Sequence, residues 1–410
     1  MLTRQGWLVT AGAVVLVAAG RLLGVFELFV LGVAAAALVG LTFAVVLLVR
    51  LRLEVARHLS PPRVHAGTPS RVELRLRNRG ERSTPVLRLF DPVSGTRGAD
   101  LHLAPLEPLG TAQAAYRLPT DRRGIIRVGP LEVVVDDPFG LASVRTIAAP
   151  RTELTVYPRI DAIVPVPYTS GHDPHAGAEH PTALGRTGED FYALRQYVLG
   201  DDIRRVHWPS TARRDELMVR QDELPWQGRV VVLLDVRRST HTAASLELAV
   251  SAAASVVTAS WQRQDLVRML STDGADSGFA AGTAHVEAIM EHLATVQATP
   301  GGTFKGMVES FSQSRRGGGG LVAVVADVTE PELTALARLR ASFGSVTIVQ
   351  FDRSSWDRAA PAPAVAPSLP GLVKVTGQVA FADAWNRAMQ GRGRLGRRLV
   401  RRAATPGAIR

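Results

Sequence analysis

The chain has 410 residues, enough for two or three domains that each bury a hydrophobic core. Its formal net charge is +11, and nearly all of the positive charge is arginine; this bias of composition does not by itself indicate nucleic acid, so no nucleic-acid partner is expected. The chain has no cysteine, which excludes disulfides, thiol nucleophiles and metals held by cysteine.

Residues 28–49 form an uncharged run rich in valine, leucine and alanine, which is long enough to cross a bilayer as one helix. Residues 7–20 are also apolar, and Arg21 and Glu27 are the only charges between the two runs. We therefore predict a transmembrane helical hairpin over residues 1–50.

Arginines flank both predicted spans: Arg4 precedes the first span, and the second is followed by Arg50, Arg52, Arg57 and Arg63. By the positive-inside rule both flanks face the cytoplasm, so we predict a multi-pass protein of the cell membrane with the bulk of the chain in the cytoplasm. An alternative is that residues 1–19 are a cleaved signal peptide, because a charged start, a short apolar stretch and small residues at its end resemble one. Both alternatives leave everything after Arg50 in the cytoplasm.

Residues 51–158 change to short alternating runs divided by turn residues, a pattern typical of strands. Strands at this spacing, without helical periodicity, predict an immunoglobulin-like or fibronectin-like β-sandwich. The predicted strands lie at residues 72–77, 86–90, 112–118, 125–128, 131–135, 141–147 and 153–157.

Residues 159–187 are rich in proline, glycine, histidine and threonine and lack periodicity, so we predict a linker. Residues 188–225, here called the signature segment, interleave arginines and carboxylates with aromatic side chains, which predicts an ordered, ion-paired segment. Such a segment is either a structural charge network at a domain junction or a protein contact surface, since arginine and aromatic residues are enriched in interfaces. The candidate partner-binding residues are Arg195, Tyr197, Asp201, Arg204, His207, Trp208 and Arg213.

Residues 226–390 alternate strands with helices, which predicts an α/β domain with a doubly wound, mostly parallel sheet covered on both faces. Ligands of such a sheet bind beyond the carboxyl ends of its strands. The predicted strands lie at residues 229–235, 266–270, 321–326, 346–351 and 372–375, and the helices at residues 245–263, 285–294, 304–314, 331–343 and 381–389. Residues 391–410 form a basic tail without acidic residues, which is predicted to face anionic lipid.

The signature segment also carries a resemblance to a known family. The residues concerned are Gly188, Phe191, Leu194, Arg195, Tyr197, Gly200, Asp201, Arg204, His207, Trp208, Ser210, Ala212, Arg213, Val219 and Arg220. Together they resemble the signature of the bacterial "domain of unknown function 58" family. The resemblance implies a membrane-anchored protein whose α/β domain is von Willebrand factor A-like, with a MoxR-type AAA+ ATPase as its partner in a chaperone-like or cell-envelope assembly role.

Four residues are candidates for a metal site at the carboxyl edge of the predicted sheet: Asp235, Ser239, Thr303 and Asp327. They resemble the metal-ion-dependent adhesion site of von Willebrand A domains, where an Asp-x-Ser-x-Ser loop, a threonine and a second aspartate hold a divalent cation. Mg²⁺ fits this chemistry, because it takes a few carboxylate or hydroxyl oxygens and keeps several waters. Arg237 replaces the first serine of that loop, so its cation is expected to repel the metal and to pair with Asp235 or Asp327.

These features predict a non-enzymatic, membrane-anchored scaffold that faces the cytoplasm and binds protein partners through the adhesion-like site and the signature segment. The alternative is an enzyme in which Asp201, His207 and Arg213 act as an acid–base set, because histidine titrates near neutrality and a neighbouring carboxylate can orient it. The sequence has no phosphate-binding P-loop, Gly-x-Ser-x-Gly elbow or His-Glu-x-x-His string, which favours the scaffold.

Overall fold

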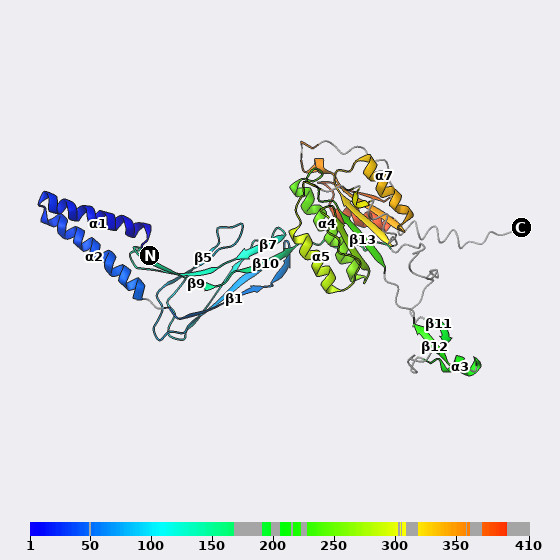
Figure 1. Cartoon of the computed structure of the whole chain (residues 1–410), viewed down its shortest axis with the longest axis horizontal. Coiled ribbons are helices and arrows are strands. Elements are labelled where there is room, and N and C mark those ends of the chain that lie inside the picture. The colour runs from blue at the N-terminus through cyan, green and yellow to red at the C-terminus, as the bar shows by residue number, and fades with distance from the viewer. Residues whose placement is uncertain are drawn as a thin grey trace. The chain divides into compact units, whose positions relative to one another are not determined.

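The computed structural model describes residues 1–48, 51–167, 191–197, 206–214, 216–222, 228–301, 304, 306–308, 319–357, 359–360 and 371–391. It divides into two compact units (Figure 1). The first comprises Met1–Arg159 with Glu291–Thr295, and the second comprises Ile160–Met290 with Val296–Arg410.

Two apolar helices open the first unit, α1 (Arg4–Leu23) and α2 (Phe26–Leu48), joined through Gly24 in the left-handed conformation. Only 17% and 22% of their most apolar 18-residue windows are buried, although both are long and apolar enough to span a membrane. A third helix of sufficient length, α4 (Ala243–Gln262), is 72% buried and belongs to the core of the second unit. The two N-terminal helices therefore leave apolar surface that suits a bilayer, as the sequence predicts.

The two helices lie side by side as an antiparallel pair, and glycines allow their close approach (Figure 1). A Cβ added at Gly20 would lie 2.5 Å from the backbone nitrogen of Phe29, and one added at Gly32 would lie 2.8 Å from the Val17 side chain. By contrast, a Cβ at Gly12 would meet nothing within 4 Å. One glycine on each helix, Gly20 on α1 and Gly32 on α2, therefore lies where the partner helix leaves no room for a side chain.

We expect Gly20→Leu to separate the two helices by about 2 Å, because helix packing distances follow the size of the side chains between them. The distance between spin labels introduced at Trp7 and Leu47, both exposed, would measure this in lipid nanodiscs. Gly12→Leu is the matched control and should leave the distance unchanged. Equal distances in the two variants would show that the glycine contact does not hold the pair together.

Residues 51–159 of the first unit, here called the β domain, are β-rich as predicted and contain three sheets around one hydrophobic core. Its strand β3 (Arg71–Asn78) alternates strictly, with Val72, Leu74 and Leu76 buried. The sheets are β1 (Leu53–Ser60), β3 and β6 (Thr111–Arg117); β5 (Ala99–Leu103), β4 (Leu87–Asp91), β8 (Leu131–Asp136) and β9 (Ser143–Ala149); and β2 (Arg63–His65), β10 (Thr152–Tyr157) and β7 (Gly124–Val128).

Three strands were not predicted, namely β1, β2 and β5. Each lies at the edge of its sheet, so it has a neighbour on one side only. Few of their residues are fully buried. In β1, Arg57 takes an apolar position of the alternation, and β2 has only three residues. The strand β5 does alternate, but it is five residues long and its apolar side chains are only half-buried, so the prediction missed it.

Part of the predicted linker is packed rather than free. Residues 160–167 lie along the second unit, where Trp385 Nε1 donates to the Val164 carbonyl at 2.7 Å and the Val164 amide donates to Asn386 Oδ1 at 2.8 Å. Val166 is fully buried, and its carbonyl accepts a hydrogen bond from Arg263. Residues 168–187 lie outside the described residues.

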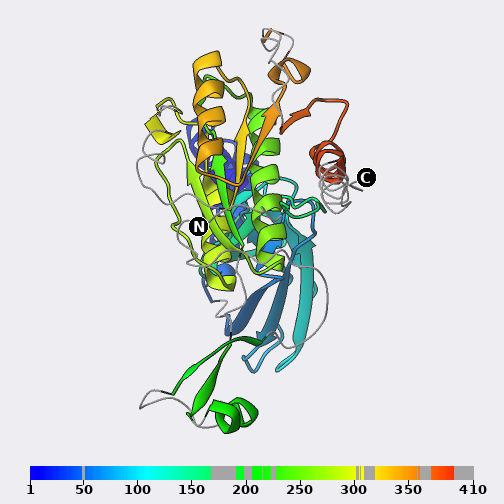
Figure 2. The ribbon, with the colours of Figure 1, turned by 90° about the vertical axis from the view of Figure 1, so that its right-hand side faces the viewer.

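The second unit contains a five-stranded parallel sheet in the order β14-β13-β15-β16-β17, which confirms the predicted α/β architecture. Its central strands are buried on both faces, and helices lie on either side of the sheet (Figure 2). The strands are β13 (Arg229–Leu234), β14 (Leu266–Ser271), β15 (Gly320–Val325), β16 (Ser345–Phe351) and β17 (Leu372–Val375). Among the described residues, the helices are α4, α5 (Thr283–Thr295), α7 (Glu330–Arg338) and residues 381–391. Of the predicted helix at residues 304–314, residues 304 and 306–308 are helical and the others lie outside the described residues. The predicted helix at residues 331–343 is shorter than expected, because a 3-10 turn (Leu339–Ala341) follows α7.

The signature segment is described in part. It forms a two-stranded antiparallel sheet of β11 (Phe191–Gln196) and β12 (Met218–Asp222), with the short helix α3 (Trp208–Arg214) between them. The described strands of this ribbon pair only with each other.

Candidate functional site

The candidate site lies where the strand order of the sheet reverses. The chain passes from β13 outward to β14, and then crosses back to place β15 on the other side of β13. In open α/β sheets a crevice forms at such a reversal, outside the carboxyl ends of the two strands. Asp235 follows β13 directly, and Asp327 follows β15 after Ala326. Both carboxylates named from the sequence therefore lie at this edge.

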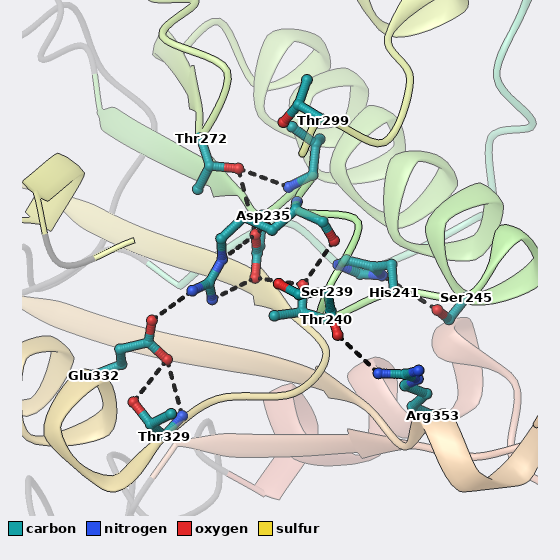
Figure 3. Close-up of polar contacts among 12 residues, drawn as sticks. Asp235, Ser239, Thr240, His241, Ser245, Thr272, Thr299, Thr329, Glu332 and Arg353 are labelled. Atoms are coloured by element: carbon teal, nitrogen blue, oxygen red, sulfur yellow. Dashed lines mark hydrogen bonds and ion pairs between the residues drawn. The ribbon is translucent and has the colours of Figure 1, made fainter. Parts of the chain in front are cut away.

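Asp235 is completely buried, and an arginine from its own loop neutralises it. Arg237 Nε and Nη2 donate to Oδ1 and Oδ2 of Asp235 at 2.9 and 2.8 Å (Figure 3). Thr240 Oγ1 donates to Oδ2 at 3.1 Å, and Thr272 Oγ1 lies 3.3 Å from Oδ1. A buried carboxylate is stable only when it is paired and hydrogen-bonded, and here both of its oxygens are engaged.

The third nitrogen of the same guanidinium contacts a second carboxylate. Arg237 Nη1 donates to Glu332 Oε1 at 2.7 Å, while Glu332 Oε2 accepts from the amide and the hydroxyl of Thr329 at 2.9 Å each (Figure 3). Thr329 and Glu332 form a capping box at the start of α7. One glutamate thus caps a helix and fixes Arg237, so the position of α7 is coupled to the loop after β13.

Burial works against the charge of Arg237, but its hydrogen bonds and its attraction to Asp235 and Glu332 outweigh that effect, so the pKa of Arg237 is raised above its ordinary value. The guanidinium also lies over the Phe304 ring, 5.6 Å from its centre. It therefore stays protonated and fixed between the two carboxylates.

The described residues do not fit Mg²⁺ in this arrangement. Both oxygens of Asp235 accept from Arg237, and a hard cation needs those oxygens as ligands. Across the described ranges, no group of three or more histidine, aspartate or glutamate residues is placed to hold a metal ion. The expected pairing of Arg237 with Asp235 is present, whereas its other partner is Glu332 and not Asp327.

The other members of the predicted site lie at its rim. Ser239 is exposed, and its carbonyl accepts from Arg353 Nη1 at 2.8 Å (Figure 3). Asp327 is half-buried in the loop between β15 and α7. Thr303 lies outside the described residues, so the complete set named from the sequence stays a prediction.

His241 adds a titratable group beneath this loop. Its Nδ1 lies 3.3 Å from Ser245 Oγ, within the first turn of α4 (Figure 3). Burial lowers the pKa of His241 to about 4, and the charge of Asp235 opposes this shift only in part. The histidine is therefore neutral in the folded protein at neutral pH.

We expect His241 to make the folded state less stable in acid. Its pKa falls from 6.5 in the unfolded chain to about 4 in the folded one, so between these pH values the unfolded state binds the extra proton. Stability should then decrease as the pH falls from about 6.5 to about 4, by up to about 1.4 kcal/mol per pH unit. Urea unfolding of the protein and of His241→Gln across this range measures the effect. A variant with the same pH slope as the unchanged protein would contradict it.

The residues named in the signature segment are only partly described. Trp208 begins α3 and is 62% exposed, Arg213 is exposed on the same helix, and Tyr197 is half-buried, with its amide donating to the Leu217 carbonyl at 2.8 Å. His207 Nδ1 lies 2.8 Å from Ser210 Oγ. Arg195 lies on β11, opposite Val219. Asp201 and Arg204 lie outside the described residues, so the acid–base set and the contact surface both stay predictions.

Sequence reasoning missed several members of the cluster: Thr240, His241, Thr272, Glu332 and Arg353. A signal existed for one of them, because Thr329-Glu330-Pro331-Glu332 has the spacing of a capping box and so marks the start of α7. Thr240 and His241 lie in the loop directly after Asp235, but they stand outside the Asp-x-Ser-x-Ser positions that were considered. Thr272 and Arg353 come from segments distant in sequence, with no spacing that links them to Asp235.

These observations define a chain with an N-terminal pair of apolar helices, a β domain, and an α/β domain that carries an arginine–carboxylate cluster at the edge of its parallel sheet. The family follows from comparison: residues 193–355 belong to the family described as "Protein of unknown function DUF58", whose model matches them. The match includes most of β11, the loop of Asp235 and Arg237, and Glu332. The family assignment made from the sequence is thereby confirmed.

No curated protein matches the chain. Among solved structures it is similar to the CARDB domain of a Pyrococcus furiosus protein in complex with di-metal ions, at 16% identity over 26% of this chain and 92% of that one, with a TM-score of 0.21. It is also similar to the Deinococcus radiodurans RO protein, at 17% identity over 42% of this chain and 36% of that one, with a TM-score of 0.28. Likenesses of this size carry no argument about function.

Proposed function

We propose that the protein is a membrane-anchored scaffold that binds a protein partner at the carboxyl edge of its α/β sheet. The helices α1 and α2 hold it in the cell membrane with the rest of the chain in the cytoplasm. The β domain, as an immunoglobulin-like or fibronectin-like sandwich, spaces the binding domain from the bilayer. The α/β domain is von Willebrand factor A-like, and Arg237 takes the place of its metal ion.

One observation carries this proposal: the arginine–carboxylate cluster lies at the strand-order reversal of the sheet, where such folds bind their ligands. The internal cation satisfies Asp235 without a metal and keeps the loop of residues 236–240 in one conformation. That loop presents the exposed Arg238 and Ser239 at the surface, with Arg353 beside them. The exposed cation of Arg238 at the rim favours an acidic group on the partner.

The family resemblance indicates a MoxR-type AAA+ ATPase as the partner. The signature segment supplies a second contact surface in this proposal. A two-stranded ribbon is marginally stable in water by itself, and Trp208, a residue type enriched in binding hot spots, is exposed on its helix. Binding of a partner across the ribbon would bury that tryptophan.

Binding of the purified full-length chain to a MoxR-type ATPase tests the proposal. We expect Arg238→Glu to weaken binding about tenfold, because it reverses a rim charge opposite an acidic group. Arg340→Glu is the matched control: it is the same exposed charge reversal, but lies in the 3-10 turn that leads into the amino end of β16. Equal effects of the two reversals, or no binding of any AAA+ protein, would contradict the proposal.

A further inference from the structure

One end of the β domain carries three exposed apolar side chains, each in a different loop. Val86 is 56% exposed, Leu109 65% and Phe139 62%. Their loops, here called the hairpin-side loops, are residues 79–86, 104–110 and 137–142.

Strand register places two of these loops at the end of the domain that the helices enter. Leu53, five residues after the end of α2, pairs with Asn78, and Arg77 pairs with Thr111. Loop 79–86 therefore leaves β3 at that end, and loop 104–110 enters β6 there. The Arg79 amide donates to the Arg52 carbonyl at 2.7 Å. Five residues span at most about 17 Å, so both loops lie close to the membrane end of α2.

The third loop contacts the start of α1 directly. The Thr3 amide donates to the Leu141 carbonyl at 2.9 Å, and Thr3 Oγ1 donates to the Gly140 carbonyl at 2.5 Å. The amino group of Met1 donates to the Ser143 carbonyl at 2.6 Å. A Cβ at Gly6, in the first turn of α1, would overlap the Leu141 carbonyl. Phe139 therefore stands at the level where α1 begins.

Buried polar residues hold all three loops in place. Asn78 Nδ2 donates to the carbonyls of Arg82, Leu106 and Glu107 at 2.8, 3.1 and 3.1 Å, which ties the first two loops together. In the third loop Asp137 accepts from the amides of Phe139 and Ala142. The exposed apolar tips are therefore presented on ordered turns.

The backbone conformation of Leu109 indicates that a leucine side chain is required at this position of loop 104–110. Its φ is +61°, in the left-handed region that favours glycine or asparagine, and its side chain is largely exposed. A leucine in this conformation costs stability, and with 65% of its surface exposed it gains little packing within the domain. A contact outside the domain accounts for it.

We propose that the hairpin-side loops insert Val86, Leu109 and Phe139 into the lipid interface, so that the β domain sits directly on the bilayer. Apolar and aromatic side chains partition into this layer, and the exposed Arg4 and Arg52 at the two helix ends suit anionic headgroups. Three tips and two helices fix the tilt of the domain. The inference rests on the membrane anchoring in the proposed function.

Single-cysteine labelling tests this without background, since the chain has no cysteine of its own. The full chain is reconstituted in phosphatidylcholine–phosphatidylglycerol vesicles, and an environment-sensitive fluorophore is placed at Val86→Cys, Leu109→Cys or Phe139→Cys. We expect emission at shorter wavelength and quenching by nitroxide-labelled lipid at all three positions. Ile147→Cys is the matched control, because Ile147 is 67% exposed but lies four residues, about 13 Å, along β9 from Ser143.

A probe at Val15→Cys, exposed in the middle of α1, separates the two possible failures. If that probe is not quenched by lipid, the membrane anchoring itself is wrong. If it is quenched while the three loop probes behave like the one at position 147, the anchoring stands and the loop insertion is overturned.

Discussion

Replacing Arg237 with methionine is expected to lower the free energy of unfolding of the α/β domain by about 3–5 kcal/mol, which is typical for breaking a buried ion pair. Asp235 is 0% exposed, so its charge would be left in the interior with only hydroxyl and amide donors around it. Glu332 would lose its cation as well. Urea unfolding followed by the fluorescence of the buried Trp385 measures the change.

Two further variants separate charge pairing from the loss of a long side chain. Arg353→Met removes an arginine whose Nη1 donates to the Ser239 carbonyl, so we expect a loss of only about 1 kcal/mol. Adding Asp235→Asn to Arg237→Met should restore most of the lost stability, because the unpaired buried charge is gone. Asp235→Asn alone completes the comparison. If the double variant lost as much free energy of unfolding as Arg237→Met and Asp235→Asn lose together, the ion pair would not be what holds the loop.

The fold was predictable where the burial of an element produces a clear pattern of apolar residues in the sequence. The central strands β13, β15 and β16 of the α/β sheet are buried on both faces, so they form almost continuous apolar runs, and the sequence located them to within a few residues. The helices α1 and α2 were equally visible through their length. The edge strands β1 and β5 bury less: the alternation of β1 is broken at Arg57, and β5 alternates over only five residues.

The candidate site was predictable in part for a different reason. Asp235 and Arg237 lie within three residues of one another, so the sequence alone showed that Arg237 replaces the first serine of an adhesion-type loop. Glu332 follows Arg237 by 95 residues, and only the crossover from β15 to α7 brings it to the loop. Contacts of this kind depend on which strands are neighbours, and one sequence does not reveal the strand order.

If Arg237 takes the place of a metal ion, then removing it while adding an oxygen ligand should create a metal site. Arg237→Ser frees both oxygens of Asp235 and restores a hydroxyl at the first serine position of the Asp-x-Ser-x-Ser order. The hydroxyl groups of Thr240 and Thr272 already lie within 3.3 Å of that carboxylate. These are the oxygen donors that Mg²⁺ takes.

We therefore expect Mg²⁺ to raise the stability of Arg237→Ser by about 2.7 kcal/mol at a concentration one hundred times its Kd, and to leave the unchanged protein unaffected. Thermal unfolding with and without Mg²⁺ measures both, and calorimetry gives the Kd of the variant. Arg237→Met is the matched control, because it removes the same cation without supplying an oxygen and should bind Mg²⁺ more weakly. Arg238→Ser, one residue away on the exposed rim, should gain nothing. If Mg²⁺ stabilised the unchanged protein as much as Arg237→Ser, the metal would displace the Arg237 guanidinium from Asp235. Partner binding at this edge would then be expected to depend on the metal.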